Sequence, residues 1–211
     1  MFQFIISIFV VFSGIFTLYS REQDLRIPLY IFKPLTMILI LLIAMKNGQP
    51  DPSHYSWLII GGLVFCLIGD IFLMLPSDCF VAGLISFLIG HIVYISAFTI
   101  GKEFSLTLWL LIPFMIYGAL MYRILFPTLH EMKIPVFVYT VVIVVMAWQA
   151  WERWYVFREN PALYASVGAV FFLASDSVLA FNRFRKEFRH AHVFILSTYF
   201  LAQWMIALSV G

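Results

Sequence analysis

The sequence predicts an all-α, polytopic integral membrane protein with eight transmembrane helices. Hydrophobic residues make up 63% of its 211 residues, against about 45–50% in soluble domains. Charged residues make up 11%, less than half the usual share of about 25%. The apolar residues also gather in runs long enough to cross a bilayer, which takes about 20 residues. This composition excludes a soluble enzyme, a nucleic-acid-binding module and a disordered chain.

The eight predicted helices are apolar runs separated by short pieces that are polar or rich in turn residues. In chain order the runs cover 2–19, 28–45, 56–75, 80–99, 104–122, 134–151, 161–180 and 191–209. The pieces between them are, in the same order, REQDLR, KNGQPDPSH, PSD, GKE, HEMK, ERWYVFREN and NRFRKEFRH. Runs of this length are expected to be helices, because a backbone in lipid must satisfy its own polar groups. No piece is long enough for another domain, so residues 1–211 are expected to form one helical bundle.

The loops on the two sides of the predicted bundle differ in charge. Side A holds the loops after the first, third, fifth and seventh helices and carries eight Lys and Arg residues, whereas side B carries four. Because cytoplasmic loops are enriched in Lys and Arg, we expect side A to be cytoplasmic and both termini to lie outside. The first run lacks a preceding basic residue and a cleavage site, so it is expected to remain as an anchor. Trp148, Trp151 and Trp154, with Tyr155, are expected to form an interfacial belt on side B.

Four ionisable residues lie inside the predicted helices, namely Lys33, Asp70, His91 and Asp176. A charge there costs at least about 2.5–3.5 kcal/mol on insertion scales, so each one requires an explanation. At a rise of about 1.5 Å per residue, three of the four lie within roughly 8 Å of side A. Lys33 could extend to the headgroups, and His91 could bond to a neighbouring backbone carbonyl. An aspartate is too short to do the former, so the two aspartates favour a functional site near side A.

A short internal repeat relates the two aspartates. The segments 67–73 and 173–179 share the pattern L-x-small-D-x-x-L, about half the chain apart. This pattern predicts a parallel duplication of the first four and last four helices about an axis along the membrane normal. Such symmetry would bring Asp70 and Asp176 to one cavity, and a chance match of a short motif is the alternative.

Two carboxylates beside a lysine and a histidine suit general acid and base catalysis. The seventh predicted loop adds Arg183 and Arg185, whose guanidinium groups match a phosphate at the headgroup level. His192, Tyr199 and Gln203 form a polar stripe that would serve either this site or helix packing. Only one of the five histidines is embedded, so no metal site is expected.

Five segments resemble the YhhN family, in order and over nearly the whole chain. They are 32–36 (FKPLT), 67–70 (LIGD), 87–94 around His91, 175–180 (SDSVLA) and 198–203 (TYFLAQ). The resemblance implies a lysoplasmalogenase of the bacterial inner membrane. Such an enzyme hydrolyses the vinyl ether of a lysoplasmalogen to a fatty aldehyde and glycerophosphoethanolamine or glycerophosphocholine. That reaction requires no cofactor, and the expected partners are the lysophospholipid and the bilayer.

The resemblance implies site residues at Lys33, Gly69, Asp70, His91, Tyr94, Asp176 and Gln203. We therefore expect catalytic roles for Asp70, Asp176, His91 and Lys33. Substrate contacts are expected from Tyr30, Tyr94, Asn182, Arg183, Arg185, Tyr199 and Gln203. Which aspartate is the acid stays open, with Asp70 preferred as the base if Lys33 lies beside it. Two alternatives are a proton-coupled transporter or lipid flippase, with the aspartates as proton carriers, and a non-catalytic scaffold, which leaves the aspartates unexplained. The sequence does not indicate an oligomeric state.

Overall fold

The computed structural model describes residues 2–101 and 107–211, and within these ranges every regular element is helical. The long helices are α1 (Phe2–Glu22), α2 (Arg26–Asn47), α3 (His54–Met74), α4 (Phe80–Thr99), α5 (Leu108–Leu125), α6 (Lys133–Phe157), α7 (Asn160–Phe184) and α8 (Ala191–Leu208). Two 3-10 helices, η1 (Phe126–Thr128) and η2 (His130–Met132), connect α5 to α6. All eight long helices are long and apolar enough to cross a membrane, which confirms the predicted fold class. Lys102 and the predicted start of the fifth helix at residue 104 lie outside the described residues.

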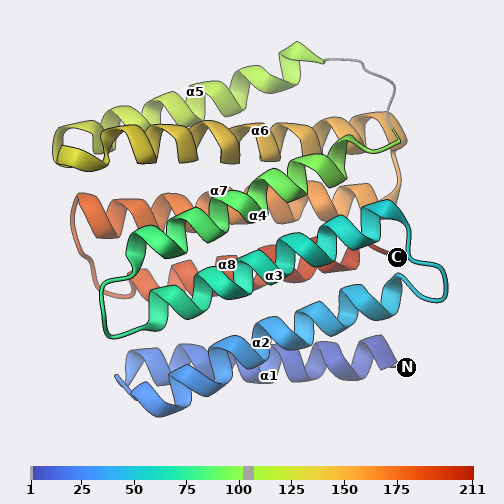
Figure 1. Ribbon diagram of the computed structural model, residues 1–211, viewed down its shortest axis with the longest axis horizontal. Coiled ribbons are helices and arrows are strands. Elements are labelled where there is room, and N and C mark those ends of the chain that lie inside the picture. Colours follow the sequence, from blue (N-terminus) through green and yellow to red (C-terminus); the bar gives the residue numbers. More distant parts are fainter. Residues whose placement is uncertain (1, 102–106) are drawn as a thin grey trace.

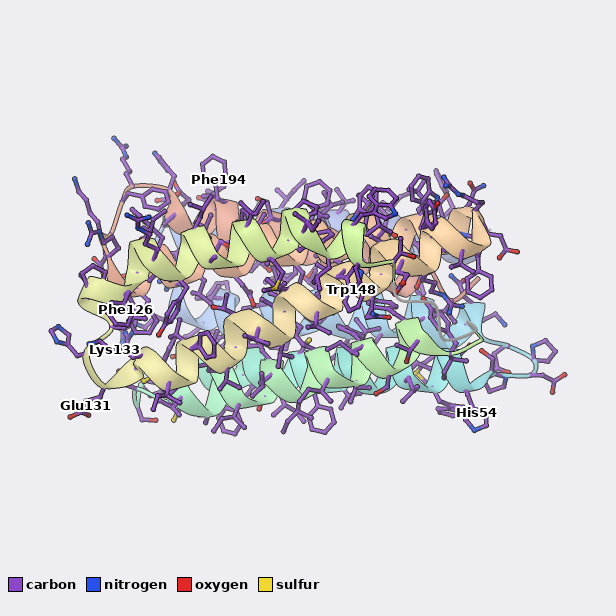
Figure 2. All side chains as sticks on the ribbon, turned by 90° about the horizontal axis from the view of Figure 1, so that it is seen from above. His54, Phe126, Glu131, Lys133, Trp148 and Phe194 are labelled. Atoms are coloured by element: carbon purple, nitrogen blue, oxygen red, sulfur yellow. The ribbon has the colours of Figure 1, made fainter. Side chains whose placement is uncertain are left out.

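The helices run up and down across the bundle, so both termini lie at one end of the molecule (Figure 1). The connections after α1, α3, α5 and α7 lie at the other end, which is side A. Figure 2 shows Phe126, Glu131 and Lys133 at side A and His54 at the opposite end. Within the bundle α3 packs on α4, α7 packs on α8, and α8 also contacts α1, α2 and α3. Only 11% of the residues in the most apolar stretch of α5 are buried, against 50% of those in α8. Helix α5 is therefore a lipid-facing helix at the edge of the bundle.

A seam of glycines brings α3 and α4 into close contact. A Cβ atom at Gly69 would lie 2.8 Å from the ring of Phe87, and one at Gly83 would lie 3.3 Å from the carbonyl oxygen of Gly69. Seven residues deeper along each helix, a Cβ atom at Gly90 would lie 3.2 Å from the carbonyl oxygen of Gly62. The seven-residue spacing places each pair of glycines on one helix face, where small residues allow the backbones to approach. The seam ends directly before Asp70 and so positions that residue.

Several predicted helix ends are too early, and the differences are largest for the sixth and seventh helices. The sixth and seventh predicted helices end at residues 151 and 180, whereas α6 continues to Phe157 and α7 to Phe184. Charged residues beyond position 151 are compatible with the helix because they find hydrogen-bond partners in the protein. The guanidinium of Arg153, for example, donates a hydrogen bond to the carbonyl oxygen of Ile100 at 2.7 Å. Trp148 is only 7% exposed and therefore lies in the core, so its predicted place in an interfacial belt is wrong.

Candidate active site

A cavity of about 530 Å³ lies at the side A end of the bundle. Its walls come from the end of α1, the start of α2, the end of α3 with the turn that follows, the start of α4, the end of α7 and the start of α8. Seven of the eleven predicted site residues line this cavity: Tyr30, Lys33, Asp70, Asp176, Asn182, Arg183 and Tyr199. The structure therefore brings residues from α2, α3, α7 and α8 to one place.

Asp70 is held by two partners, one on each carboxyl oxygen. The ammonium group of Lys33 lies 2.8 Å from Oδ1, and the hydroxyl of Tyr199 donates to Oδ2 at 2.6 Å. The two side chains of the ion pair are 9% and 2% exposed, so little solvent reaches either charge. Lys33 points into the bundle rather than toward the headgroups, which removes the snorkelling alternative. The ammonium group and the hydroxyl donor both favour the charged carboxylate form of Asp70, against the cost of burying that charge.

Asp176 has a different kind of partner. It lies eight residues before the end of α7, two helical turns or about 12 Å below side A. The hydroxyl of Tyr139, on α6, donates a hydrogen bond to its Oδ2. Among the described ion pairs none involves Asp176. Tyr139 was missed from the sequence, because a tyrosine inside an apolar run is indistinguishable from an ordinary core residue.

The cavity thus holds two carboxyl groups in unlike surroundings. Asp70 faces a cation, and Asp176 faces a neutral hydroxyl. Environments that differ in this way allow one carboxyl to remain an anion while the other holds a proton, which is the arrangement used for paired acid and base chemistry. Within the described ranges no three His, Cys, Asp or Glu side chains gather closely enough to hold a metal ion.

Three predicted site residues lie behind the cavity rather than in its wall. His91 is fully buried, with its ring edge-on to Phe172 at 4.6 Å and to Tyr139 at 5.3 Å between centroids. Neither of its ring nitrogens has a hydrogen-bond partner among the described residues, so the alternative of a bond to a neighbouring carbonyl is not made there. The hydroxyl of Tyr94 donates to Oε1 of Gln203 at 2.8 Å, deeper between α4 and α8. These residues support the wall that carries Asp176 and Tyr199.

The predicted polar stripe of α8 divides among separate partners. Tyr199 bonds to Asp70 and Gln203 to Tyr94, while His192 bonds to Arg21 at 2.8 Å. The stripe therefore serves both the site and helix packing.

The mouth of the cavity carries charged residues near side A. The guanidinium of Arg183 lies 2.5 Å from Asp78, and both side chains are well exposed. The hydrogen bond and the charge of Arg183 lower the pKa of Asp78. Arg21 and Arg26 also line the cavity and were counted from the sequence only as loop cations. Arg185 is exposed and is not among the lining residues.

The YhhN family matches residues 29–210 of this chain. The chain is 30% identical to the uncharacterized membrane protein YhhN of Escherichia coli O6:H1 over 181 residues, which is 86% of each protein. It is 32% identical to human lysoplasmalogenase TMEM86B over 156 residues, 74% of this chain and 64% of the human protein. It is 35% identical to bovine lysoplasmalogenase TMEM86A over 159 residues, 70% of this chain and 62% of the bovine protein. No solved structure matches this chain.

Proposed function

The chain belongs to the YhhN family, and on that premise we propose that it is a membrane lysoplasmalogenase. Its substrate is a glycerophospholipid with one vinyl-ether chain, and its products are a fatty aldehyde and the glycerophospho-alcohol. The observation that carries the proposal is the cavity shared by Asp70 and Asp176, whose unlike partners suit a base and an acid. Relatives named lysoplasmalogenase support the substrate class.

In this mechanism Asp176 is the acid. It gives a proton to the vinyl carbon beta to the ether oxygen, which leaves an oxocarbenium ion at the adjoining carbon. The carboxylate of Asp70 stabilises that positive charge and accepts a proton from the water that attacks it. The resulting hemiacetal breaks its carbon–oxygen bond to the glycerol: the glycerol oxygen takes the proton that Asp70 accepted, and the hemiacetal hydroxyl releases its proton to solvent as the aldehyde forms. One water is consumed in total, and Asp176 recovers its proton from solvent through the cavity.

The remaining residues position the substrate. Lys33 and Tyr199 keep Asp70 charged and oriented, and Tyr139 orients Asp176. Cations near side A suit the phosphate of the headgroup, with Arg183 at the mouth of the cavity. We propose that this active site lies at the more basic face of a bacterial inner membrane, the face that the loop charges predict to be cytoplasmic.

The alternative of a proton-coupled transporter would require polar groups toward both ends of the bundle. Every residue that lines the cavity belongs to the side A half of its helix or to a side A connection. The cavity itself therefore does not extend toward side B.

The test is aldehyde release by the purified protein in detergent. We expect aldehyde from a lysoplasmalogen and none from a lysophospholipid whose single chain is a saturated alkyl ether, because only the vinyl group can be protonated at carbon. The conservative variant Glu131→Gln, at the exposed side A surface (Figure 2), serves as the control and should retain full activity. Absence of aldehyde from the folded wild-type protein would contradict the proposal.

A further inference from the structure

A second, narrow cavity of about 60 Å³ adjoins the polar cavity between α4, α5, α6 and α7. We call it the apolar slot. Five residues line both spaces: Leu73, Phe80, Phe87, Asp176 and Leu179. The two spaces therefore meet at the side chain of one of the two cavity aspartates.

The apolar slot differs from the polar cavity in its lining. Asp176 is the one charged residue among those that line it. Beyond Asp176 the walls are formed by side chains such as Met121 on α5, Ile143 on α6 and Leu173 on α7. The larger cavity, by contrast, is lined by several cations and carboxylates from the side A end. A lining of this kind suits hydrocarbon and not a phosphate or a glycerol.

The slot also lies at the depth of a lipid chain. On α7 its lining extends from Phe184 at side A to Leu173, eleven residues or about 16 Å deeper. That distance leads from the headgroup level toward the middle of the bilayer, whose hydrocarbon core is about 30 Å thick. A molecule with its phosphate at the mouth of the polar cavity would thus reach the slot with its chain.

We propose that the apolar slot binds the single hydrocarbon chain of the lipid substrate, with the bond to be cleaved held at Asp176 where the two spaces meet. This inference rests on the proposed function for the identity of the lipid. It assigns a binding role to residues on α5 and α6, which contribute nothing to the polar cavity. A slot this narrow accepts one chain and orients it, so that the carbons next to the ether oxygen come to the acid first.

Filling the slot tests the proposal. Thr140 lines the slot and its neighbour Val141 is 45% exposed on the lipid-facing side of the same helix. Thr140→Phe should therefore block the slot, while Val141→Phe adds the same ring outside it. Ala180→Leu fills the slot from α7 and provides a second, smaller obstruction if Thr140→Phe folds poorly.

The readout is binding of saturated alkyl-ether lysophosphoethanolamines, which hold no vinyl group and are not consumed. We expect Thr140→Phe or Ala180→Leu to weaken binding of the hexadecyl compound by about tenfold or more, the worth of roughly two excluded methylene groups. The methyl compound, whose single ether carbon does not extend past Asp176 into the slot, should bind to these variants as it does to the wild type, and Val141→Phe should leave both affinities unchanged. Folded slot variants that bind both compounds like the wild type, or lose both equally, would overturn the proposal.

The same proteins separate this inference from the proposed function. Suppose that the wild type releases no aldehyde but its preference for the longer chain disappears in the slot variants. That result would support the chain-binding role of the slot and contradict the hydrolase assignment. If aldehyde is released and no variant changes the preference for the longer chain, the result would contradict the chain-binding role of the slot and support the hydrolase assignment.

Discussion

At the scale of single residues, the two aspartates differ in what their carboxyl oxygens contact. Asp70 has a lysine and a tyrosine within hydrogen-bond distance, and Asp176 has a tyrosine alone. Tyr139→Phe should therefore lower kcat about tenfold to a hundredfold with little change in KM, because it removes a hydrogen bond to the reacting acid but keeps the ring. Tyr122→Phe is the matched control, since its hydroxyl bonds to the carbonyl oxygen of Lys133 outside both cavities. Equal kinetics for the two variants would remove Tyr139 from the mechanism.

The ion pair at the mouth of the cavity leads to a prediction about substrate binding. Asp78 competes with a phosphate for Arg183, so Asp78→Asn should lower KM for the lysolipid without changing kcat. The effect should fade as salt is raised, because both side chains are exposed. Steady-state kinetics at low and high ionic strength measure it. A raised KM would show that Asp78 itself assists binding.

The pH dependence of the pair between Asp78 and Arg183 follows from the direction in which the pKa of Asp78 is shifted. Because Arg183 lowers the pKa of Asp78, the pair is intact above the usual aspartate pKa of about 3.9 and is lost only as pH falls through the lowered value. Between about pH 5 and 8 the difference in KM between Asp78→Asn and the wild type should therefore stay constant.

Reasoning from the sequence identified candidate site residues where a charge interrupts an apolar run. Lys33, Asp70 and Asp176 were found for that reason, and the structure places all three in one cavity. Tyr139 was not found, because its hydroxyl only becomes notable once α6 is seen to face α7. The pairing of Arg183 with Asp78 was also missed, because the two residues are far apart in the sequence.

At the scale of helices, the contact between α3 and α4 makes a prediction with a neighbouring control. A Cβ atom at Gly62 would overlap the ring of Tyr94, whereas one at Gly61 would lie 3.6 Å from a methyl group of Val93, an ordinary contact. Gly62→Ala should destabilise the protein by about 1–3 kcal/mol, the usual cost of overpacking, and lower its Tm. Gly61→Ala should leave Tm unchanged or slightly raised, because alanine favours a helix. Thermal unfolding of both variants in the same detergent tests this prediction. Equal Tm values for the two variants would contradict the close contact between Gly62 and Tyr94.

The number of helices can be predicted from the hydropathy of the sequence, but the residues at which the helices end cannot. Apolar runs place all eight helices, since lipid requires each run to satisfy its own backbone. The last turns of α6 and α7 contain charges that hydropathy assigns to loops. Polar groups elsewhere in the protein bind these charged side chains: the carbonyl oxygen of Ile100, for example, accepts a hydrogen bond from Arg153. Such partners come from distant parts of the chain and are not visible in a local window of sequence.

At the scale of the whole molecule, the loop charges predict that side A faces the cytoplasm. In a Cys79→Ser background, a cysteine introduced by Lys186→Cys should resist membrane-impermeant thiol reagents in intact cells, whereas Gln49→Cys should react. Cys66 is buried and should stay silent. Labelling in the opposite sense would reverse the orientation but would leave the site at the same end of the bundle.

The predicted internal repeat stays a prediction. Asp70 and Asp176 lie on α3 and α7, the third helix of each half, and both line the polar cavity. That placement is what the duplication requires. The sequence motif is too short to establish it.

The central claim is that Asp70 and Asp176 act together as base and acid on a vinyl ether. Specific aldehyde release per folded molecule, compared for the wild type, Asp70→Asn, Asp176→Asn and the double variant, tests it most directly. We predict that each single variant loses about 10²–10⁴ in kcat, and that the double variant is little worse than the poorer single, because the two groups serve one reaction. Well-folded single variants with near-normal aldehyde release would contradict the claim.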